Sequence, residues 1–293
     1  MTDLPPCTLH QVSDHVWWFT PDSRTDRASL AVVVGDKGTL MLELGASPAH
    51  TREFLQALKD NNIPQPDTAV LTHWHWDHSF GMEALDIPFT AQRETAQHLQ
   101  RMADYDYSDD GLDELVKHGI EVEFTRDHMM IELDDTQRRN LKLRQPDYIF
   151  DETHHYDLGN VTCEVVHVGG DHSADSCVMY IPQDKVLFMG DCFYYTVYEE
   201  PNHYTKAVLN LIQRLESFDA EQYIEGHSNQ ITPASEIKGW FALIKQAFAV
   251  IDQHGIDNQT VLVDELTKDF AEEDVLDFLS PIIAGYKLGK SRQ

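Results

Sequence analysis

Short runs of apolar residues alternate along the chain with longer segments whose apolar residues recur at helical spacing, and this predicts an α/β protein. In the first third of the chain, the apolar runs predict strands at residues 8–20, 29–34, 38–44, 68–72 and 87–90. A hairpin turn at 35–38 would join the second strand to the third. Helical spacing is found at 48–61, 81–85 and 92–102.

The same alternation returns in the second half of the chain. Strands are predicted at 148–150, 161–167, 177–181, 186–189 and 222–225, and helices at 208–218, 234–253 and 262–279. No repeat of 20 to 50 residues is evident. The order of elements predicts two similar β-rich halves, each backed by helices, in one domain that spans residues 1–293.

Residues 104–147 interrupt this pattern with a charge-rich segment that shows no strand. Helical spacing at 111–118 and 127–139 predicts a mostly helical insertion between the halves. Two interpretations are open: the insertion covers or flanks the functional site, or it is a solvated excursion unrelated to substrate. In the first case its basic cluster could hold an anionic part of the substrate. The cluster consists of Arg138, Arg139, Lys142 and Arg144.

Composition and charge narrow the possible partners. A net charge of −28 argues against nucleic acid, because phosphates are bound mainly by Lys and Arg. The four cysteines form no C-x-x-C pair, which is typical of buried thiols in a reducing compartment. Residues 1–6 lack the basic and apolar regions of a leader peptide, and no apolar run is long enough to span a membrane. We therefore expect a cytoplasmic protein without a membrane partner, and a homodimer stays open.

The pattern H-x-H-x-D-H follows the predicted strand at 68–72 and consists of His73, His75, Asp77 and His78. Side chains alternate along an extended segment, so His73 and His75 point the same way and could bind one metal ion. Beyond the strand the chain can turn, which would bring Asp77 and His78 to a second position nearby. A histidine-rich surface turn is the alternative, but surface His and Asp seldom gather at the end of a buried strand. We interpret the motif as a metal site.

Three later segments each place a His or an Asp beside glycine, just past a predicted strand. These residues are His172, Asp191 and His227. Each alone could equally be a turn residue or a histidine bonded by the backbone. As a set at strand ends, they would lie at one edge of a sheet and complete the metal site.

This ordered set resembles the metallo-β-lactamase-fold hydrolase superfamily over about residues 10–255, apart from the insertion. The resemblance implies a four-layer αβ/βα sandwich with a two-metal site at the edge of the two sheets. It would place the ligands of one metal at His73, His75 and His172. It would place those of the other at Asp77, His78 and His227, with Asp191 bridging. Imidazole and carboxylate ligands agree with Zn²⁺, which we expect, or with Mn²⁺ or Fe.

Two positions depart from the family pattern. Glu43 stands after a hairpin strand where members commonly carry Asp, and we expect it to accept hydrogen bonds from N–H groups of the ligands. Asp171 precedes His172 where many members have Gly. This extra carboxylate could strengthen metal retention or simply face solvent.

The resemblance also implies the chemistry. A hydroxide held between two metals would attack an electrophilic carbonyl or phosphorus, and Asp77 could orient it or relay a proton. Tyr194 lies three residues beyond Asp191, a spacing similar to that in the acyl-homoserine-lactone lactonases of the family. There the tyrosine hydrogen-bonds the substrate carbonyl or leaving group. Tyr195 or Tyr198 could take this place instead, or the aromatic cluster could serve packing alone.

Within this fold the sequence favours some activities over others. The negative charge argues against nucleases, His75 against flavodiiron oxygen reductases, and the missing leader against exported β-lactamases. We expect a binuclear hydrolase of a small-molecule ester, thioester or lactone, in a lactonase-like or glyoxalase-II-like branch. Alternatives are a phosphodiesterase, a β-lactamase-like hydrolase and a mononuclear iron dioxygenase acting on a persulfide. A non-enzymatic binding module is a third class, although such relatives tend to lose ligands.

Overall fold

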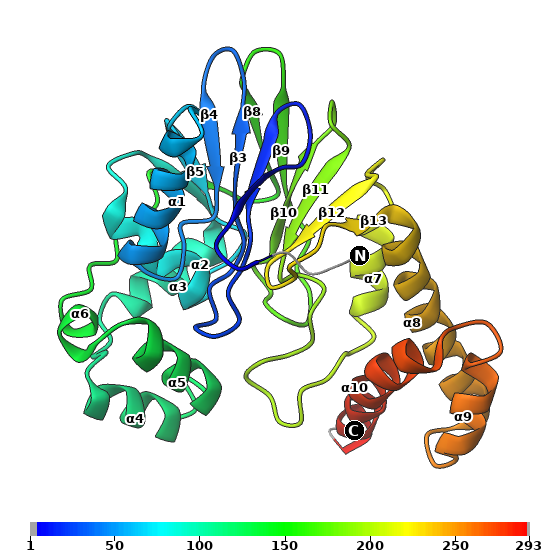
Figure 1. Ribbon diagram of the computed structural model, residues 1–293. Helices are drawn as coiled ribbons and strands as arrows, with labels where there is room; N and C mark the ends of the chain where they lie inside the picture. Colours follow the sequence, from blue (N-terminus) through cyan, green and yellow to red (C-terminus); the bar gives the residue numbers. More distant parts are fainter. Residues whose placement is uncertain (1–4, 292–293) are drawn as a thin grey trace.

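Two β-sheets lie face to face in the computed structural model, and helices cover the outer face of each sheet (Figure 1). The structure describes residues 5–291. Residues 1–4, on which the expectation of no leader peptide partly rests, lie outside the described residues. The arrangement is the four-layer αβ/βα sandwich predicted above. No helix in residues 5–291 is both long and apolar enough to cross a lipid bilayer.

The first sheet has seven strands in chain order, antiparallel from β1 to β4 and parallel from β4 to β7. Its strands are β1 (Leu9–Gln11), β2 (Val16–Phe19), β3 (Leu30–Val34), β4 (Thr39–Leu42), β5 (Thr68–Val70), β6 (Phe89–Gln92) and β7 (Tyr148–Phe150). The connections form α1 (Pro48–Asp60), α2 (Trp76–Ser79), the 3₁₀ helix η1 (Phe80–Ala84) and α3 (Arg93–Met102). Phe54 and Leu58 of α1 and Leu99 of α3 are buried in the apolar layer on the outer face of this sheet.

The second sheet has six strands in the order β13-β12-β11-β10-β9-β8. Its strands are β8 (Thr153–Asp157), β9 (Thr162–His167), β10 (Cys177–Ile181), β11 (Val186–Gly190), β12 (Gln222–Glu225) and β13 (Thr232–Pro233). Helices α7 (Val208–Leu215) and α8 (Ala234–His254) cover its outer face (Figure 1). Between the two sheets lies a buried layer of apolar side chains that includes Val33, Leu40, Val165 and Phe188. This layer fixes how the ends of strands from the two halves meet.

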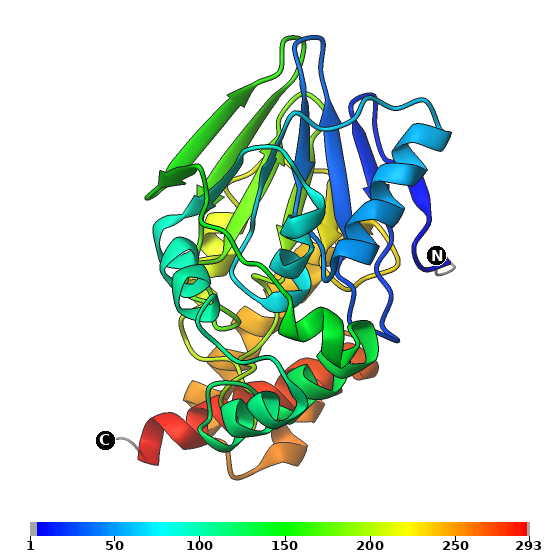
Figure 2. The same ribbon diagram turned by 90° about the vertical axis from the view of Figure 1, so that its left-hand side faces the viewer.

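The remaining helices extend beyond one end of the sheets (Figure 1, and turned in Figure 2). The insertion contains α4 (Asp109–Lys117), α5 (Glu123–Glu132) and α6 (Asp135–Arg139). It is mostly helical as predicted, but the helix predicted at 127–139 is interrupted, because Leu133 and Asp134 are extended between α5 and α6. On the other side lie α9 (Gln259–Leu266) and α10 (Glu272–Ser291). Both groups lie at the same end of the sandwich as the motif at residues 73–78.

Several elements differ from the sequence prediction. The single strand predicted at 8–20 is a hairpin of β1 and β2, because the polar residues Ser13 and Asp14 lie in a turn closed by a 2.9 Å bond from Val12 N–H to Val16 C=O. The helix predicted at 262–279 is two helices, since three acidic residues at 272–274 favour a new helix start there. The edge strand β8 was not predicted, because its sequence THHYD is largely polar.

Candidate metal centre

The motif residues lie where the chain leaves β5 and turns over the edge of the first sheet. His73 and His75 stand in the loop after β5, and α2 begins at Trp76. Asp77 and His78 therefore lie in the first turn of α2, where the amide of His78 donates to the carbonyl of His75 at 3.2 Å. The turn after the strand separates the four side chains into two pairs, as the sequence analysis expected.

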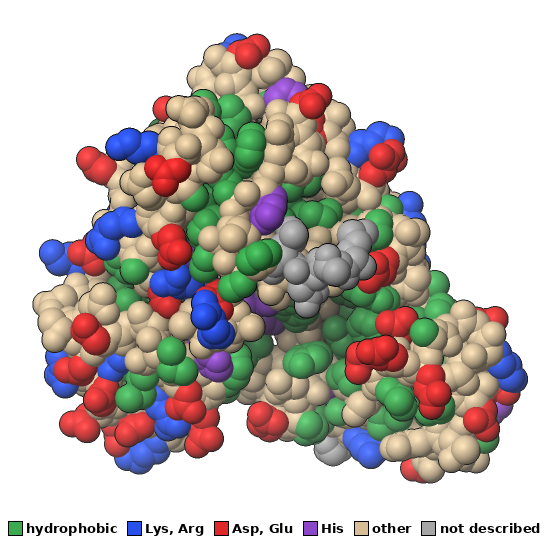
Figure 3. Space-filling model, viewed as in Figure 1, with side chains coloured by type: hydrophobic (Ala, Val, Ile, Leu, Met, Phe, Trp, Pro, Cys, Tyr) green, Lys and Arg blue, Asp and Glu red, His purple; other side chains and the backbone are tan. Residues whose placement is uncertain are grey.

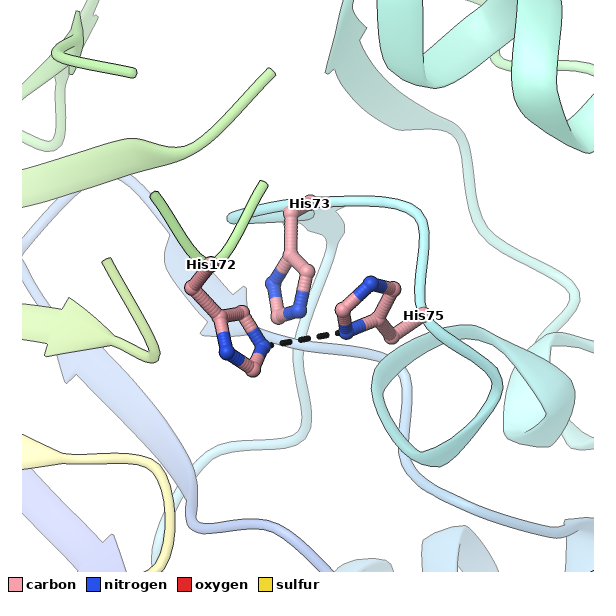
Figure 4. Close-up of side chains that lie close together, drawn as sticks. All are labelled: His73, His75 and His172. Atoms are coloured by element: carbon pink, nitrogen blue, oxygen red, sulfur yellow. Dashed lines mark hydrogen bonds between the residues drawn. The ribbon is translucent and has the colours of Figure 1, made fainter. Parts of the chain in front are cut away.

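Three histidines form the first cluster (Figure 4). His73 and His75 come from the loop after β5 and His172 from the loop after β9, and their rings point toward one another. One nitrogen from each lies within 4.8 Å of the others. Nε2 of His172 is 3.0 Å from Nδ1 of His75. Tetrahedral zinc with Zn–N bonds of 2.0–2.1 Å would set its ligand nitrogens about 3.3 Å apart, so the cluster has the size of a metal site.

The second cluster consists of Asp77, His78, Asp191 and His227, whose ligand atoms lie within 4.8 Å of one another. Asp191 follows β11 and His227 follows β12 in the second sheet. Oδ2 of Asp191 is 3.2 Å from Nε2 of His78 and 3.2 Å from Nε2 of His227. The same oxygen is 3.4 Å from Nε2 of His172 in the first cluster. Asp191 thus lies between the clusters, and the structure brings all seven predicted residues together.

Buried polar atoms in these clusters lack hydrogen-bond partners among the described residues. They include Nε2 of His73 and Oδ2 of Asp77. Leaving such atoms unpaired in the interior costs on the order of 1–3 kcal/mol each, more for a charged group. Lone pairs that converge in this way suit divalent cations, and the residues present therefore fit the metal ions that the motif implies.

The protonation states of His73, His75 and Asp191 agree with this fit. Burial holds the pKa values of His73 and His75 well below the ordinary value, so their imidazoles are neutral and have a free lone pair. For Asp191, burial disfavours ionisation, but the neighbouring His227 and His78 hold its pKa well below the ordinary value. Neutral imidazoles and ionised carboxylates are the forms that bind metals. Burial lowers the pKa of His78 and His227, but the neighbouring carboxylates of Asp77 and Asp191 raise it well above the ordinary value, so these two imidazoles would release a proton on binding a metal ion.

Glu43 lies behind the ligands, but its hydrogen bonds come from Thr72 and not, as we expected, directly from N–H groups of the ligands. One of its oxygens accepts from the hydroxyl of Thr72, and the other accepts from the Thr72 amide at 3.2 Å. The Thr72 hydroxyl oxygen is in turn 2.9 Å from Nδ1 of His73. This chain of hydrogen bonds makes Nδ1 of His73 the donor and leaves Nε2 free to face the cluster. Oε1 of Glu43 also lies 3.2 Å from Nδ1 of His78.

The backbone at the site is unusual at two positions. Glu43 is fully buried and has φ of +70°, a conformation that costs a non-glycine residue free energy. Its carboxylate is thereby held under the histidines. At Gly226, a Cβ atom would overlap the carboxylate of Asp191, so only glycine leaves room for that side chain.

Asp171 belongs to neither cluster. Its carboxylate accepts from the amide of Thr205 at 2.8 Å and from the Thr205 hydroxyl at 2.6 Å. Neither open interpretation of this residue is therefore correct: it does not join the metal ligands, and it is not simply turned to solvent. It fastens the end of the loop at 191–207, which follows β11.

Three tyrosines of that loop line the cleft, namely Tyr194, Tyr195 and Tyr198. The loop is not extended, because the amide of Tyr194 donates to the carbonyl of Asp191 at 2.9 Å and closes a turn. The alternation of side chains along an extended strand therefore does not apply to Tyr194 and Tyr195, and both line the cleft. The Tyr194 hydroxyl accepts from the amide of His227 at 3.3 Å, and burial raises its pKa well above the ordinary value. The phenol thus stays protonated, with its hydrogen available for another acceptor.

A cleft of about 1250 Å³ opens over both clusters. Its walls include residues 121–125 of the insertion, so the prediction that the insertion borders the cleft is confirmed. The basic cluster proposed for an anionic substrate is not part of the described lining. Arg138 is buried, where it donates to the carbonyl of Tyr107 at 3.1 Å and pairs with Asp109. Arg144 pairs with Asp147 at 3.0 Å and lies over the ring of Phe89. These arginines hold the insertion together, and the prediction that they face the substrate is wrong.

Two further acidic residues at the site were not predicted. Asp26 lies in the polar turn before β3, with Oδ1 at 3.6 Å from Nδ1 of His227. Glu121 lies in the insertion, is 3% exposed and lines the cleft. Neither belongs to a motif, and each reaches the site only through tertiary packing. The charge-rich sequence around both gives no signal that separates them from surface carboxylates.

Comparisons with known proteins agree with the fold and the motif. The family model described as Metallo-beta-lactamase superfamily matches residues 24–227. The acyl-coenzyme A thioesterase MBLAC2 of Bos taurus is 24% identical over 238 residues, which cover 74% of this chain and 80% of that protein. The Homo sapiens protein of the same name is 23% identical over 238 residues, with the same coverage of 74% and 80%.

Two solved structures share the fold. A metallo-β-lactamase from Pontibacter korlensis has a TM-score of 0.55 at 22% identity and covers 78% of this chain and 94% of its own. The sec-alkylsulfatase Pisa1 from Pseudomonas sp. has a TM-score of 0.60 at 16% identity and covers 84% of this chain and 43% of its own. At these identities, the likeness concerns the fold alone.

Proposed function

Because this chain belongs to the metallo-β-lactamase superfamily, we propose that it hydrolyses a small-molecule ester, thioester or lactone with two divalent metal ions. The observation that carries the two-metal proposal is the position of Asp191, whose Oδ2 lies within 3.4 Å of histidines from both clusters. A carboxylate between two triads of ligands is suited to bridging two cations. We propose the same ligand sets as in the sequence analysis, with zinc as the metal.

The bond to be cleaved is proposed from the relatives and the cleft. The curated relatives are named acyl-coenzyme A thioesterases, which supports an acyl ester or thioester as substrate. The cleft is open enough to admit a molecule of moderate size. We also propose that the specificity is lactonase-like or glyoxalase-II-like, because Tyr194 lies in the cleft beside His227.

The chain's own residues have distinct tasks in this reaction. When bound, two divalent ions supply the Lewis acidity that generates a nucleophile from water and polarises a carbonyl. Tyr194 is fixed by the amide of His227 and can donate its hydroxyl hydrogen to the carbonyl oxygen or the leaving group. Asp77, with Oδ2 at 3.2 Å from Nε2 of His227, can accept or orient a proton on the floor of the cleft. Thr72 and Glu43 keep His73 in the tautomer that binds metal.

The proposal is tested by metal analysis of the purified protein, followed by a panel of lactones, thioesters, esters, phosphodiesters and β-lactams. We expect about two metal ions per chain and turnover of an ester, thioester or lactone. His75→Ala and Asp191→Ala should abolish turnover, while His118→Ala, at an exposed histidine of the insertion, should not. One metal per chain, with activity that survives Asp191→Ala, would contradict the two-metal site. Oxygen consumption with a persulfide would show that the protein is a dioxygenase and not a hydrolase.

A further inference from the structure

The cleft over the clusters has three walls that come from distant parts of the chain. The insertion contributes Val116, Gly119 and residues 121–125, the loop after β11 contributes residues from 194 to 204, and α10 contributes Asp277 and Phe278. In Figure 3 the surface is hollowed between the helices of the insertion and those of the C-terminal region, and hydrophobic side chains are visible along the hollow. A substrate bound at the clusters would contact these walls with the parts that do not react.

Apolar side chains form much of this lining. They include Trp76, Val122, Phe124, Val197 and Phe278. Phe124 is 55% exposed, a large area of aromatic surface left in contact with water at the start of α5. Exposed apolar surface beside a cleft is typical of a site that takes an apolar ligand. An acyl chain would remove this surface from water, at about 25 cal/mol for each Å² buried.

The charged groups of the walls all have one sign. Glu123, Glu200 and Asp277 line the cleft with exposed side chains. None of the residues in the described lining is Lys or Arg. Bound metal ions would place positive charge on the floor beside Asp191, but the walls stay acidic. Carboxylates on the walls of a cleft attract cations and repel anions, most strongly at low salt.

The cations next to the lining in sequence are each matched by a carboxylate. Arg24 is 2.6 Å from Asp22, Lys117 is 2.7 Å from Glu114, and Arg126 is 2.8 Å from Asp127. These pairs add no net positive charge to the rim. A polyanionic group such as coenzyme A, with several phosphate charges, would therefore find no counter-charge on the described walls.

We propose that this cleft selects substrates with an apolar acyl chain and an uncharged or cationic leaving group, and discriminates against polyanionic leaving groups such as coenzyme A. The inference deepens the proposed function and rests on it, since the substrate is an ester, thioester or lactone in both. The proposed preference differs from the activity stated in the names of the curated relatives, which are acyl-coenzyme A thioesterases.

The test uses three octanoyl thioesters that differ only in the leaving group: N-acetylcysteamine (uncharged), thiocholine (cationic) and coenzyme A (polyanionic). At low salt we expect kcat/KM for the first two to exceed that for the coenzyme A thioester by about tenfold or more. Added salt should lower the value for thiocholine, raise it for coenzyme A and leave the uncharged thioester nearly unchanged. Equal or faster hydrolysis of the coenzyme A thioester at low salt would overturn the proposal.

A pair of double variants assigns the effect to the walls. Glu123→Gln with Asp277→Asn should narrow the gap between the coenzyme A and thiocholine thioesters. Asp36→Asn with Asp60→Asn removes the same charge from exposed positions in the β3–β4 hairpin and α1, away from the lining, and should leave the gap as it is. Equal effects of the two double variants would show that total charge, and not the cleft, sets the preference.

Binding separates this inference from the proposed function. The S-octyl thioethers of the same three thiols cannot be hydrolysed, and their affinities are measured by calorimetry with the wild-type protein. We expect the same order of preference as in hydrolysis. If this order is found while no thioester is hydrolysed, the selectivity stands and the proposed reaction fails. Tightest binding of the coenzyme A thioether would overturn the selectivity.

Discussion

The hydroxyl of Tyr198 donates a hydrogen bond of 3.1 Å to Oε2 of Glu121 and so joins the loop after β11 to the helical insertion. Tyr198 also stacks on Trp74, with ring centroids 5.6 Å apart, within the metal-binding motif. Three segments that are distant in sequence thus meet at one aromatic side chain. Glu121 is 3% exposed at this junction, and burial raises its pKa to about 7 although the Tyr198 hydrogen bond opposes the shift.

The raised pKa of Glu121 predicts how stability depends on pH. Its ordinary value is 4.5, so between pH 4.5 and about 7 the folded state binds more protons than the unfolded state. Folding stability contributed by this group therefore falls as pH rises through that range, by about 3 kcal/mol in total. Glu121→Gln keeps an acceptor for Tyr198 and removes the titration. Urea unfolding should show the variant gaining stability relative to wild type between pH 5 and pH 8.

The matched control for this measurement is Glu123→Gln, at an exposed carboxylate two residues away. This variant removes one charge from the same segment, so a pH dependence shared by both variants would come from net charge and not from the buried carboxyl. A difference between Glu121→Gln and wild type that does not change with pH would mean that the carboxyl titrates normally in the folded protein.

Thr72 connects His73 to Glu43 and predicts a second outcome. Thr72→Val keeps the shape of the side chain but removes the hydroxyl that fixes the tautomer of His73. Loss of such a supporting contact typically costs about 10–100-fold in metal affinity. Competition with a chelator measures the affinity. Thr68→Val, on β5 outside the site, should bind metal as the wild type does. Equal metal affinities in Thr72→Val and Thr68→Val would show that the Thr72 hydroxyl does not support the site.

Tyr194 predicts a third outcome, in the rate of hydrolysis. A hydrogen bond donated mainly in the transition state is worth on the order of 2–4 kcal/mol, or 10²–10³ in rate. Tyr194→Phe should therefore lower kcat for an ester or lactone by about that factor, with metal content and Tm nearly unchanged. Tyr195→Phe is the comparison, because Tyr195 also lines the cleft but is 42% exposed. If Tyr195→Phe shows the larger loss, the donor has been assigned to the wrong tyrosine.

Arg138 predicts a fourth outcome, in stability rather than in substrate choice. It is 3% exposed and donates to the carbonyls of Tyr107 and Leu133. Arg138→Met leaves the two carbonyls without a donor, at a cost of about 1–3 kcal/mol each in the free energy of unfolding, whereas Asp109 is half-exposed and returns to water. Arg139→Met, at an exposed arginine paired with Asp135, should cost less than about 1 kcal/mol. Neither should alter the preference among thioesters. A changed preference among thioesters in Arg138→Met would show that this residue does take part in substrate recognition.

The parts of the site that could be predicted are those whose residues form a short motif or directly follow a predicted strand. His73, His75, Asp77 and His78 stand in one short motif, and the strand before it fixes which side chains share a direction. The later three positions follow from strand ends beside glycine, and Gly226 shows why: a larger residue there would overlap Asp191. The sandwich itself follows from two sets of apolar strands, because both must bury a face.

What could not be predicted depends on contacts between distant segments. The part of the insertion that lines the cleft follows from its packing, and neither Glu121 nor the buried Arg138 differs in sequence from the surface charges around it. The chain forms a turn at Tyr194, so the alternation of side chains that holds for an extended strand does not apply there. The edge strand β8 pairs with β9 alone among the strands in residues 5–291, and its largely polar sequence gives no apolar pattern from which a strand could be predicted.

The order of the clustered residues along the chain has a consequence for biosynthesis. The three-histidine cluster is incomplete until His172 has been made, and the second cluster until His227 has been made. A nascent chain that carries only the motif at 73–78 therefore offers two half-sites, whose remaining ligands are still to be translated. Metal loading follows synthesis of most of the chain, and a product terminated before residue 172 contains neither complete cluster.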